Sequence, residues 1–133
     1  MDLDFAFLCD YAEVTNKINA LGIGFNAITA VQVPYVHPLF FLVVQLRSNV
    51  VEAGQKILEV RLIDADGNDI MPPKKMTFEV PKPTSGIESL GRMNIALRNI
   101  SFPHYGSYSL HIMVDGHPLH RVGFSIAKPP TTA

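Results

Sequence analysis

The stretch from Phe102 to Ile126, FPHYGSYSLHIMVDGHPLHRVGFSI, decides the fold of this protein. Apolar residues recur at every second position on both sides of the pair Asp115-Gly116. A period of two is typical of a strand with one buried face, and Asp-Gly between two such runs is typical of a tight turn. The stretch therefore predicts two antiparallel strands. Their core-facing residues would be Tyr108, Leu110, Ile112, Val114, Val122, Phe124 and Ile126.

The length of the hairpin loop decides which side chains face one another. A two-residue loop, Asp115-Gly116, would place His111 opposite His120 and set apolar residues against polar ones. A three-residue loop, Asp115-Gly116-His117, sets His111 opposite Arg121 and keeps the apolar face intact. The hydrophobic pattern favours the second register, which separates the two histidines. The apolar pairs expected from it are Leu110 with Val122 and Tyr108 with Phe124.

Short segments of the same kind recur along the rest of the chain. The predicted strands are Leu3–Cys9, Ile18–Asn26, Ile28–Val33, Leu39–Arg47, Lys56–Asp64, a broken return made of Ile70-Met71 and Met76–Val80, and Leu90–Ile100. The predicted connections are Asp10–Lys17, Tyr35–Pro38, Ser48–Gln55, a hairpin turn at Ala65–Asn68, and Pro81–Gly86. Because no segment has helical periodicity, the pattern indicates an all-β sandwich. We expect a single domain over residues 1–127 and a tail over 128–133.

Composition narrows the class of protein. The chain has 133 residues, is 47% apolar and 17% charged, and carries a net charge of −1. It has no lysine- or arginine-rich block, so nucleic acid is not an expected partner. The longest apolar run, Leu39–Val44, is far shorter than the ~20 residues that span a bilayer, so no membrane is expected either.

Cysteine usage and the first residues bear on location. Cys9 is the only cysteine, so no intrachain disulfide or thiolate metal cluster is expected. It falls on an apolar strand face, where cysteine usually packs as a small hydrophobe. The acids Asp2 and Asp4 stand where a secretory signal would carry positive charge. We therefore expect a cytoplasmic protein.

One glycine pattern resembles a nucleotide-binding motif. The run Gly22–Ala27 matches the dinucleotide fingerprint, which needs a following helix to hold the pyrophosphate. The residues that follow, Ile28–Pro34, favour a strand and then a break. We therefore interpret the two glycines as strand residues that leave room for a covering element.

Two groups of residues raise the question of a bound ion. Asp64–Asp69 places oxygen atoms at alternate positions, which suits calcium, but the glycine is fourth rather than sixth and Lys75 replaces the expected glutamate. A hairpin turn explains the same residues. The histidines lack the spacing of known zinc sites. We predict no metal site, although the sequence leaves ion binding open for both groups. The histidines are His37, His104, His111, His117 and His120.

The apolar run Leu39–Val44 predicts a strand that is covered on both faces. Two explanations of its outer face stay open. A proline-rich segment, residues 72–86, or a second sheet covers it, or it forms an interface with a second copy or another protein.

Two resemblances extend this interpretation. Pro103–Leu110 resembles the entry to the penultimate strand of immunoglobulin-like domains, with Tyr108 as the corner tyrosine and Leu110 in place of the disulfide cysteine. The chain also resembles a family of uncharacterised bacterial β-sandwich proteins. That match rests on Phe7–Ala12, Lys17–Gly22, Leu62–Gly67 and Tyr108–Gly116. The resemblances imply an immunoglobulin-like antiparallel sandwich of about seven to nine strands and no catalytic residues.

No constellation of residues carries a recognisable chemistry, so the biochemical activity is unknown at this level. The first hypothesis is a non-catalytic binding or assembly module that needs no cofactor and docks a homodimer or protein partner through Leu39–Val44. We assign it no catalytic, cofactor-binding or metal-binding residue. The alternative is a small enzyme or ligand-binding sandwich that uses outward polar residues near the Tyr108–Ile126 hairpin. Its candidate groups are His111, Arg121, Asp115 and His104.

Overall fold

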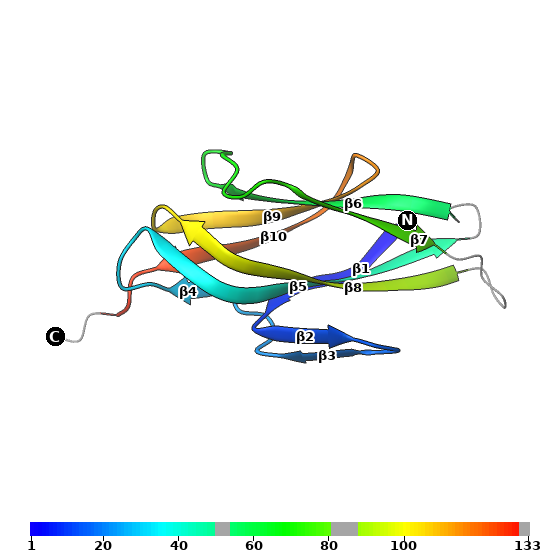
Figure 1. The fold of residues 1–133 in the computed structure, drawn as a ribbon, viewed down its shortest axis with the longest axis horizontal. Coiled ribbons are helices and arrows are strands. Elements are labelled where there is room, and N and C mark those ends of the chain that lie inside the picture. The colour runs from blue at the N-terminus through cyan, green and yellow to red at the C-terminus, as the bar shows by residue number, and fades with distance from the viewer. Residues whose placement is uncertain (50–53, 81–87, 131–133) are drawn as a thin grey trace.

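The computed structural model describes residues 1–49, 54–80 and 88–130, and these residues form strands and no helix (Figure 1). The strands are β1 (Asp2–Cys9), β2 (Tyr11–Val14), β3 (Ile18–Leu21), β4 (Ala27–Thr29), β5 (Tyr35–Asn49), β6 (Gly54–Asp64), β7 (Lys74–Val80), β8 (Glu88–Phe102), β9 (Gly106–Val114) and β10 (His117–Ala127). The prediction of an all-β protein is therefore confirmed. The described part has ten strands, one more than the sequence analysis gives, because β2 lies inside the predicted connection Asp10–Lys17.

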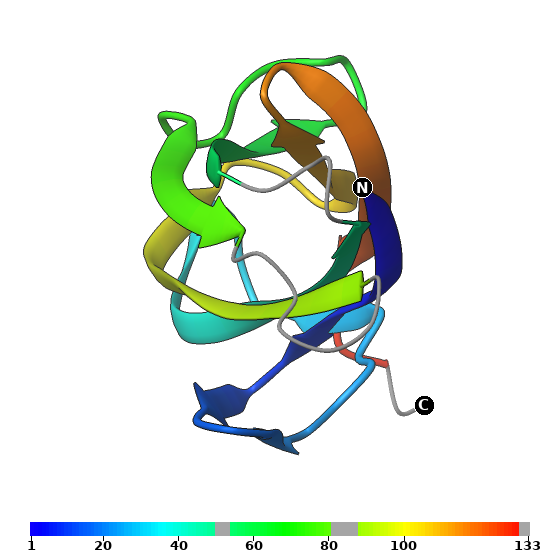
Figure 2. The ribbon, with the colours of Figure 1, turned by 90° about the vertical axis from the view of Figure 1, so that its right-hand side faces the viewer.

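Two main sheets enclose the core. One has the strand order β1-β5-β8, and the other has the order β4-β10-β9-β6-β7. All pairs in them are antiparallel except β4 and β10, which run parallel. Figure 2 shows both sheets curving strongly around the space between them. The inward residues of the long strands fill that space, and the most enclosed of them include Phe40, Leu42, Leu58, Leu62, Leu97, Phe102, Leu110, Ile112 and Ile126.

The hairpin β9–β10 has the predicted register but not the predicted loop. Leu110 pairs with Val122, and His111 pairs with Arg121. The turn is the two-residue loop Asp115-Gly116, in which both residues have positive φ, 49° and 80°, as a type I′ turn requires. A β-bulge at Leu119 then inserts one extra residue and restores the apolar register. The prediction of a three-residue loop was therefore wrong.

The region predicted as one strand, Ile18–Asn26, folds differently. β3 ends at Leu21, and Gly22 and Gly24 form a turn with φ values of 69° and 80°. The predicted connection after Cys9 contains β2, which pairs with β3 as a separate two-stranded hairpin. The interpretation of these glycines as strand residues was wrong, because the positive φ that glycine allows is used here to reverse the chain. β4 covers only the start of the predicted strand Ile28–Val33.

The apolar run Leu39–Val44 lies in β5, the central strand of its sheet. Phe40, Leu42 and Val44 face the main core, whereas Phe41 and Val43 face the hairpin β2–β3. Phe40 to Val44 are all buried within this chain. Among the described residues, the hairpin β2–β3 covers the outer face, whereas residues 81–86 of the predicted cover lie outside the described part of the chain. The side chains of this face are not free to form the predicted interface, although the existence of a partner stays a prediction.

Several boundaries differ from their predictions. Residues 35–38 belong to β5 rather than to a linker, and the ladder with β8 skips Pro38 and Asn99. Asn99 of β8 has a φ of 51°, which departs from the extended conformation of a strand. This departure occurs opposite Pro38, which has no N–H to donate to the ladder. Residues 70–71 lie outside β7, which begins at Lys74. The predicted connection Pro81–Gly86 lies outside the described residues, as do residues 50–53 of the predicted loop and the end of the tail.

Candidate functional site

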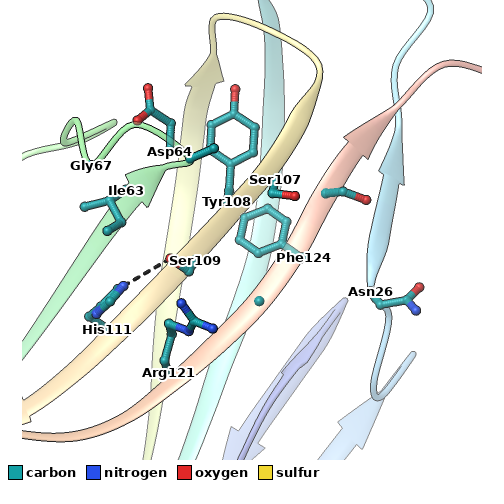
Figure 3. A pocket seen from close by; sticks show the side chains of 13 residues that line it. Asn26, Ile63, Asp64, Gly67, Ser107, Tyr108, Ser109, His111, Arg121 and Phe124 are labelled. Atoms are coloured by element: carbon teal, nitrogen blue, oxygen red, sulfur yellow. Dashed lines mark hydrogen bonds between the residues drawn. The ribbon is translucent and has the colours of Figure 1, made fainter.

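An open hollow of about 550 Å³ lies on the outer face of the five-stranded sheet. It forms over β9 and β10, beside the turn that follows β6 (Figure 3). Its polar side chains come from alternate positions of neighbouring strands, which point to the same face of a sheet. They are Ser107, Ser109, His111, Arg121 and Ser125; Asn26, just before β4, and Asp64, at the end of β6, also line the hollow.

A row of basic side chains crosses the sheet at one end of this hollow. His111 pairs with Arg121 of β10 on one side and with Arg61 of β6 on the other. Arg61 is neutralised by Asp69 at 2.9 Å, whereas Arg121 has no ion-pair partner among the described residues. Burial, Arg121 and Arg61 together lower the pKa of His111 below its usual value. The lowered pKa favours the neutral form of the His111 ring. The Nε2 atom of this ring lies 3.1 Å from the Ser109 hydroxyl oxygen.

Small residues form the floor of the hollow. Gly123 lies opposite Ser109, and Ser125 lies opposite Ser107. A Cβ added at Gly123 would meet no atom within 4 Å, so the missing side chain leaves real space above the strand. The hydroxyls of Ser107 and Ser125 and the amide of Asn26 have no side-chain hydrogen bond in the described part of the chain. These groups are free to receive a ligand.

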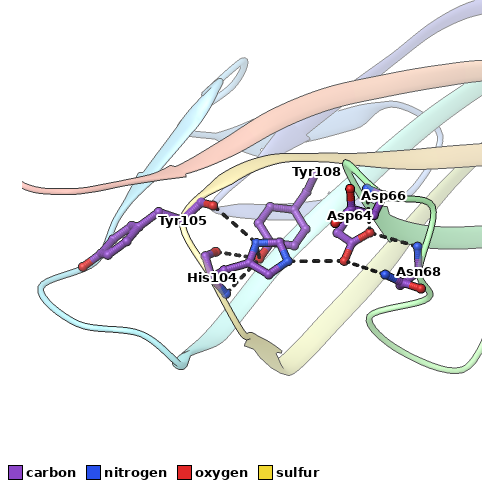
Figure 4. Close-up of polar contacts among 6 residues, drawn as sticks. All are labelled: Asp64, Asp66, Asn68, His104, Tyr105 and Tyr108. Atoms are coloured by element: carbon purple, nitrogen blue, oxygen red, sulfur yellow. Dashed lines mark hydrogen bonds and ion pairs between the residues drawn. The ribbon is translucent and has the colours of Figure 1, made fainter.

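A second polar cluster joins two turns at the end of the sandwich (Figure 4). Tyr108 donates its hydroxyl proton to the carbonyl of His104 at 2.6 Å, and the ring of His104 stacks on Tyr108 with 5.4 Å between ring centres. His104 Nε2 lies 3.3 Å from Asp64 Oδ2. The Tyr108 hydroxyl thus bonds to backbone four residues upstream, which is the contact that a corner tyrosine makes.

Asp64 is held by its own turn. Its Oδ1 accepts the backbone N–H groups of Asp66 at 3.0 Å and Asn68 at 2.9 Å. The Asn68 N–H, with help from His104, lowers the pKa of the Asp64 carboxyl although burial opposes the shift. The turn prediction for Ala65–Asn68 is confirmed, and Gly67 has a φ of 86°. Asp69 is bound to Arg61, and no group of three metal-ligating side chains occurs within residues 1–49, 54–80 and 88–130.

The Asp64–His104–Tyr108 chain resembles a proton relay, but its geometry is that of a brace. The Tyr108 proton is used by the His104 carbonyl, and burial raises the pKa of Tyr108, which makes it a poorer nucleophile. The Asp64 oxygens are occupied by the turn. The cluster therefore locks the β6–β7 turn to the β8–β9 turn and offers no activated group.

The structure brings together two of the four residues predicted for the alternative function and separates the other two. His111 and Arg121 lie together as a cross-strand pair. Asp115 lies at the far end of β9, where its Oδ1 accepts a hydrogen bond from the Ile57 N–H at 2.9 Å. His104 belongs to the brace. Sequence reasoning missed Ser107, Ser125 and Asn26, whose meeting depends on strand order. The remaining histidines, His37, His117 and His120, lie apart on β5 and β10, and burial lowers the pKa of His37.

The hairpin β2–β3 carries a different kind of surface. Its inner face packs Ala12 and Ala20 toward β5, while Tyr11 and Leu21 stay 48% and 70% exposed. Ile23, in the turn after β3, is 60% exposed. These three residues line a shallow hollow of about 650 Å³ on the hairpin. Sequence reasoning missed this apolar cluster because it placed Tyr11 in a connection and Leu21 and Ile23 in a single strand.

The described residues define an all-β protein that carries a polar hollow on one sheet and an exposed apolar cluster on the hairpin β2–β3. The chain belongs to a family of unknown function, DUF6941, whose family model matches residues 4–127. No curated protein matches the chain. It is similar to a solved structure of the Pseudomonas fluorescens alkylpurine DNA glycosylase AlkC bound to DNA containing an abasic site analog, with 12% identity and a TM-score of 0.47. The match covers 91% of this chain and 30% of the glycosylase chain.

The described residues include no helix that is long and apolar enough to cross a membrane.

Proposed function

We propose that this chain is an immunoglobulin-like assembly module that forms a homodimer through strand β3. The observation that carries the proposal is the exposed apolar cluster Tyr11, Leu21 and Ile23 beside the open edge of β3. Soluble proteins seldom expose several large apolar side chains together unless something docks there. The proposed docking surface is therefore the hairpin β2–β3 and not the run Leu39–Val44, which this hairpin covers.

The edge of β3 is suited to pairing. β2 is held on its outer side by β8, since Asn94 donates to the Ala12 carbonyl at 2.9 Å. That bond shows that the Ala12 backbone points away from β3, so in an antiparallel ladder its partner Ala20 also points away from β2. The Ala20 N–H and C=O therefore face the free edge. β3 pairs only with β2 among the described strands.

A second copy is the occupant that fits this edge best. Edge strands are usually protected by charge, proline or a bulge, and the sequence of β3, Ile18-Asn19-Ala20-Leu21, has none of these. Two β3 strands paired antiparallel about Ala20 keep Asn19 and Leu21 on one face. Such a contact is isologous and closes with two copies. It would convert two short hairpins into one four-stranded sheet, which is more stable than a two-stranded one.

The immunoglobulin-like part of the proposal is supported by topology. β1-β5-β8 opposes β10-β9-β6-β7, in the way that two antiparallel sheets face each other in immunoglobulin domains. The corner made by Tyr108 lies at the start of β9. A reducing, cytoplasmic setting is supported by Cys9, a buried free thiol. The predictions of a bacterial origin, and of no cofactor, nucleic acid or membrane partner, rest on the sequence.

Sedimentation velocity across a concentration series tests the proposal. We expect the wild-type protein to move toward twice the monomer mass of 14.7 kDa as concentration rises. Leu21→Lys places a charge beside the pairing edge and should weaken the dimer at least about tenfold. Val31→Lys is the matched control, because Val31 is 86% exposed and lies outside β3. It should leave the dimer unchanged.

A protein that stays monomeric at several hundred micromolar would contradict the proposal. Equal weakening by Leu21→Lys and Val31→Lys would also contradict it, since the association would then not depend on β3. If the protein stays monomeric but binds a different polypeptide, the partner at β3 is that polypeptide and not a second copy, and the homodimer is contradicted.

A further inference from the structure

The hollow over β9 and β10 lies on a sheet that the proposed dimer does not use. We propose that it binds a small hydroxylated anion, such as a sugar phosphate or a sugar acid. The volume of about 550 Å³ is within the ~300–1,000 Å³ typical of small-molecule sites. The ligand class follows from the order of the polar groups along the hollow.

The basic end of the hollow provides the anion-binding group. Arg121 is an unpaired guanidinium, whose planar donors match the oxygens of phosphate or carboxylate. The nearby anion, Asp64, does not compete, because its oxygens already accept the Asp66 and Asn68 N–H groups and the Asn68 amide. A ligand anion at Arg121 would also lie beside His111.

The other end of the hollow provides groups that bind hydroxyls. Ser107, Ser125 and Asn26 have free side-chain donors and acceptors in the described part of the chain. Arg121 and Ser125 are four residues apart on β10, which is about 13 Å at the rise of a strand. An inorganic ion cannot reach both ends, whereas a monosaccharide with a charged substituent nearly spans them.

The floor between the two ends is flat. Gly123 stands between Arg121 and Ser125 on the same face of β10, and it leaves the backbone uncovered. Ile63 of β6, on the other side of Ser109 from Gly123, also lines the hollow and offers an apolar surface to the C–H groups of a sugar ring. A side chain at position 123 would fill the place where the ring would lie.

The pKa of His111 should change when an anion binds in the hollow. Arg61 from β6 and Arg121 from β10 face it, and both lower its pKa together with burial. A negative ligand at Arg121 offsets that positive field, so the pKa of His111 should rise on binding. By linkage, the affinity for the anion should increase as pH falls through that range.

The test is calorimetric titration of the full chain with glucose 6-phosphate, glucuronate, glucose and inorganic phosphate, with NMR observation of the His111 ring. We expect at least one of the two sugar anions, glucose 6-phosphate and glucuronate, to bind and to raise the pKa of His111. The one that binds more tightly shows whether the site prefers phosphate or carboxylate. Glucose and inorganic phosphate should each bind at least about tenfold more weakly, because each lacks one half of the recognised groups. Arg121→Gln should weaken binding by a similar factor.

A pair of glycine variants separates loss of the site from loss of the fold. Gly123→Val should abolish binding, and Gly91→Val on β8 should preserve it. A Cβ at either position meets nothing within 4 Å, and urea unfolding of both variants checks that the γ-methyls are tolerated as well. The inference is overturned if neither sugar anion binds, or if inorganic phosphate binds as tightly as they do, which would indicate an adventitious ion only. Unchanged binding by Gly123→Val or Arg121→Gln would also overturn it.

Discussion

The Tyr108 hydroxyl donates to the His104 carbonyl at 2.6 Å and accepts the His104 N–H at 3.3 Å. Its ring packs edge-on against Phe102 at 4.9 Å between centres. One side chain thus fixes the β8–β9 turn and fills the core. Alternation predicted its place in the core, whereas its place at the corner was implied by the resemblance to immunoglobulin-like domains.

Tyr108→Phe separates these two roles. The variant keeps the ring in the core but leaves the His104 backbone groups without their partner. We expect a loss of about 1–2 kcal/mol in the free energy of unfolding, measured with urea. Tyr11→Phe is the control, because Tyr11 is 48% exposed and its change should stay within about 0.5 kcal/mol. Equal stability of Tyr108→Phe and wild type would refute the bracing role.

Asp64 gives a prediction for acid stability. Its folded-state pKa is lowered, chiefly by the Asn68 N–H, so the unfolded chain takes up this proton first. The stabilisation is complete above about pH 4 and is lost as pH falls through the lowered pKa. Asp64→Asn should reduce stability at neutral pH and flatten this acid limb, measured by urea unfolding at a series of pH values. Parallel curves for Asp64→Asn and wild type would show that the turn does not depend on the charge.

At the scale of elements, the hairpin β2–β3 depends on the turn that follows it. Gly22 has a φ of 69°, and a Cβ there would collide with the Asp10 carboxylate. The turn brings the chain back so that Gly24 N donates to the Leu8 carbonyl at 2.8 Å. The hairpin in turn covers Phe41 and Val43 of β5.

Gly22→Ala should therefore destabilise the protein by about 1–3 kcal/mol in urea unfolding, through backbone strain and the clash with Asp10. Gly91→Ala on β8 is the matched control. It should cost nothing measurable, because a Cβ at Gly91 meets no atom within 4 Å and its φ is not positive. Similar losses in both variants would mean that the turn at Gly22 is not required.

The hairpin β9–β10 shows what alternation can and cannot predict. Its register followed from matching apolar faces, and Leu110 indeed pairs with Val122. The bulge at Leu119 left no signal in the sequence, so the correct register was attributed to a longer loop. Alternation fixes which side chains face inward, whereas a bulge depends on local backbone geometry that many residues accept.

At the scale of the molecule, the prediction of an all-β fold followed from short alternating segments without helical periodicity. The two surfaces did not follow. Ser107 and Ser125 meet Asn26 only because β4 pairs in parallel with β10, a contact between distant parts of the chain. The hairpin β2–β3 was missed because Tyr11–Val14 is too short and polar to stand out from a connection.

The central claim is that the free edge of β3 pairs with a second copy. Amide hydrogen exchange tests it directly, because the Ala20 N–H faces that edge and has no partner within the described chain. We predict that Ala20 exchanges quickly in dilute protein and becomes protected as concentration rises, while Ala20 in Leu21→Lys stays fast. Fast exchange of Ala20 at every concentration, with the protein otherwise folded, would contradict the account.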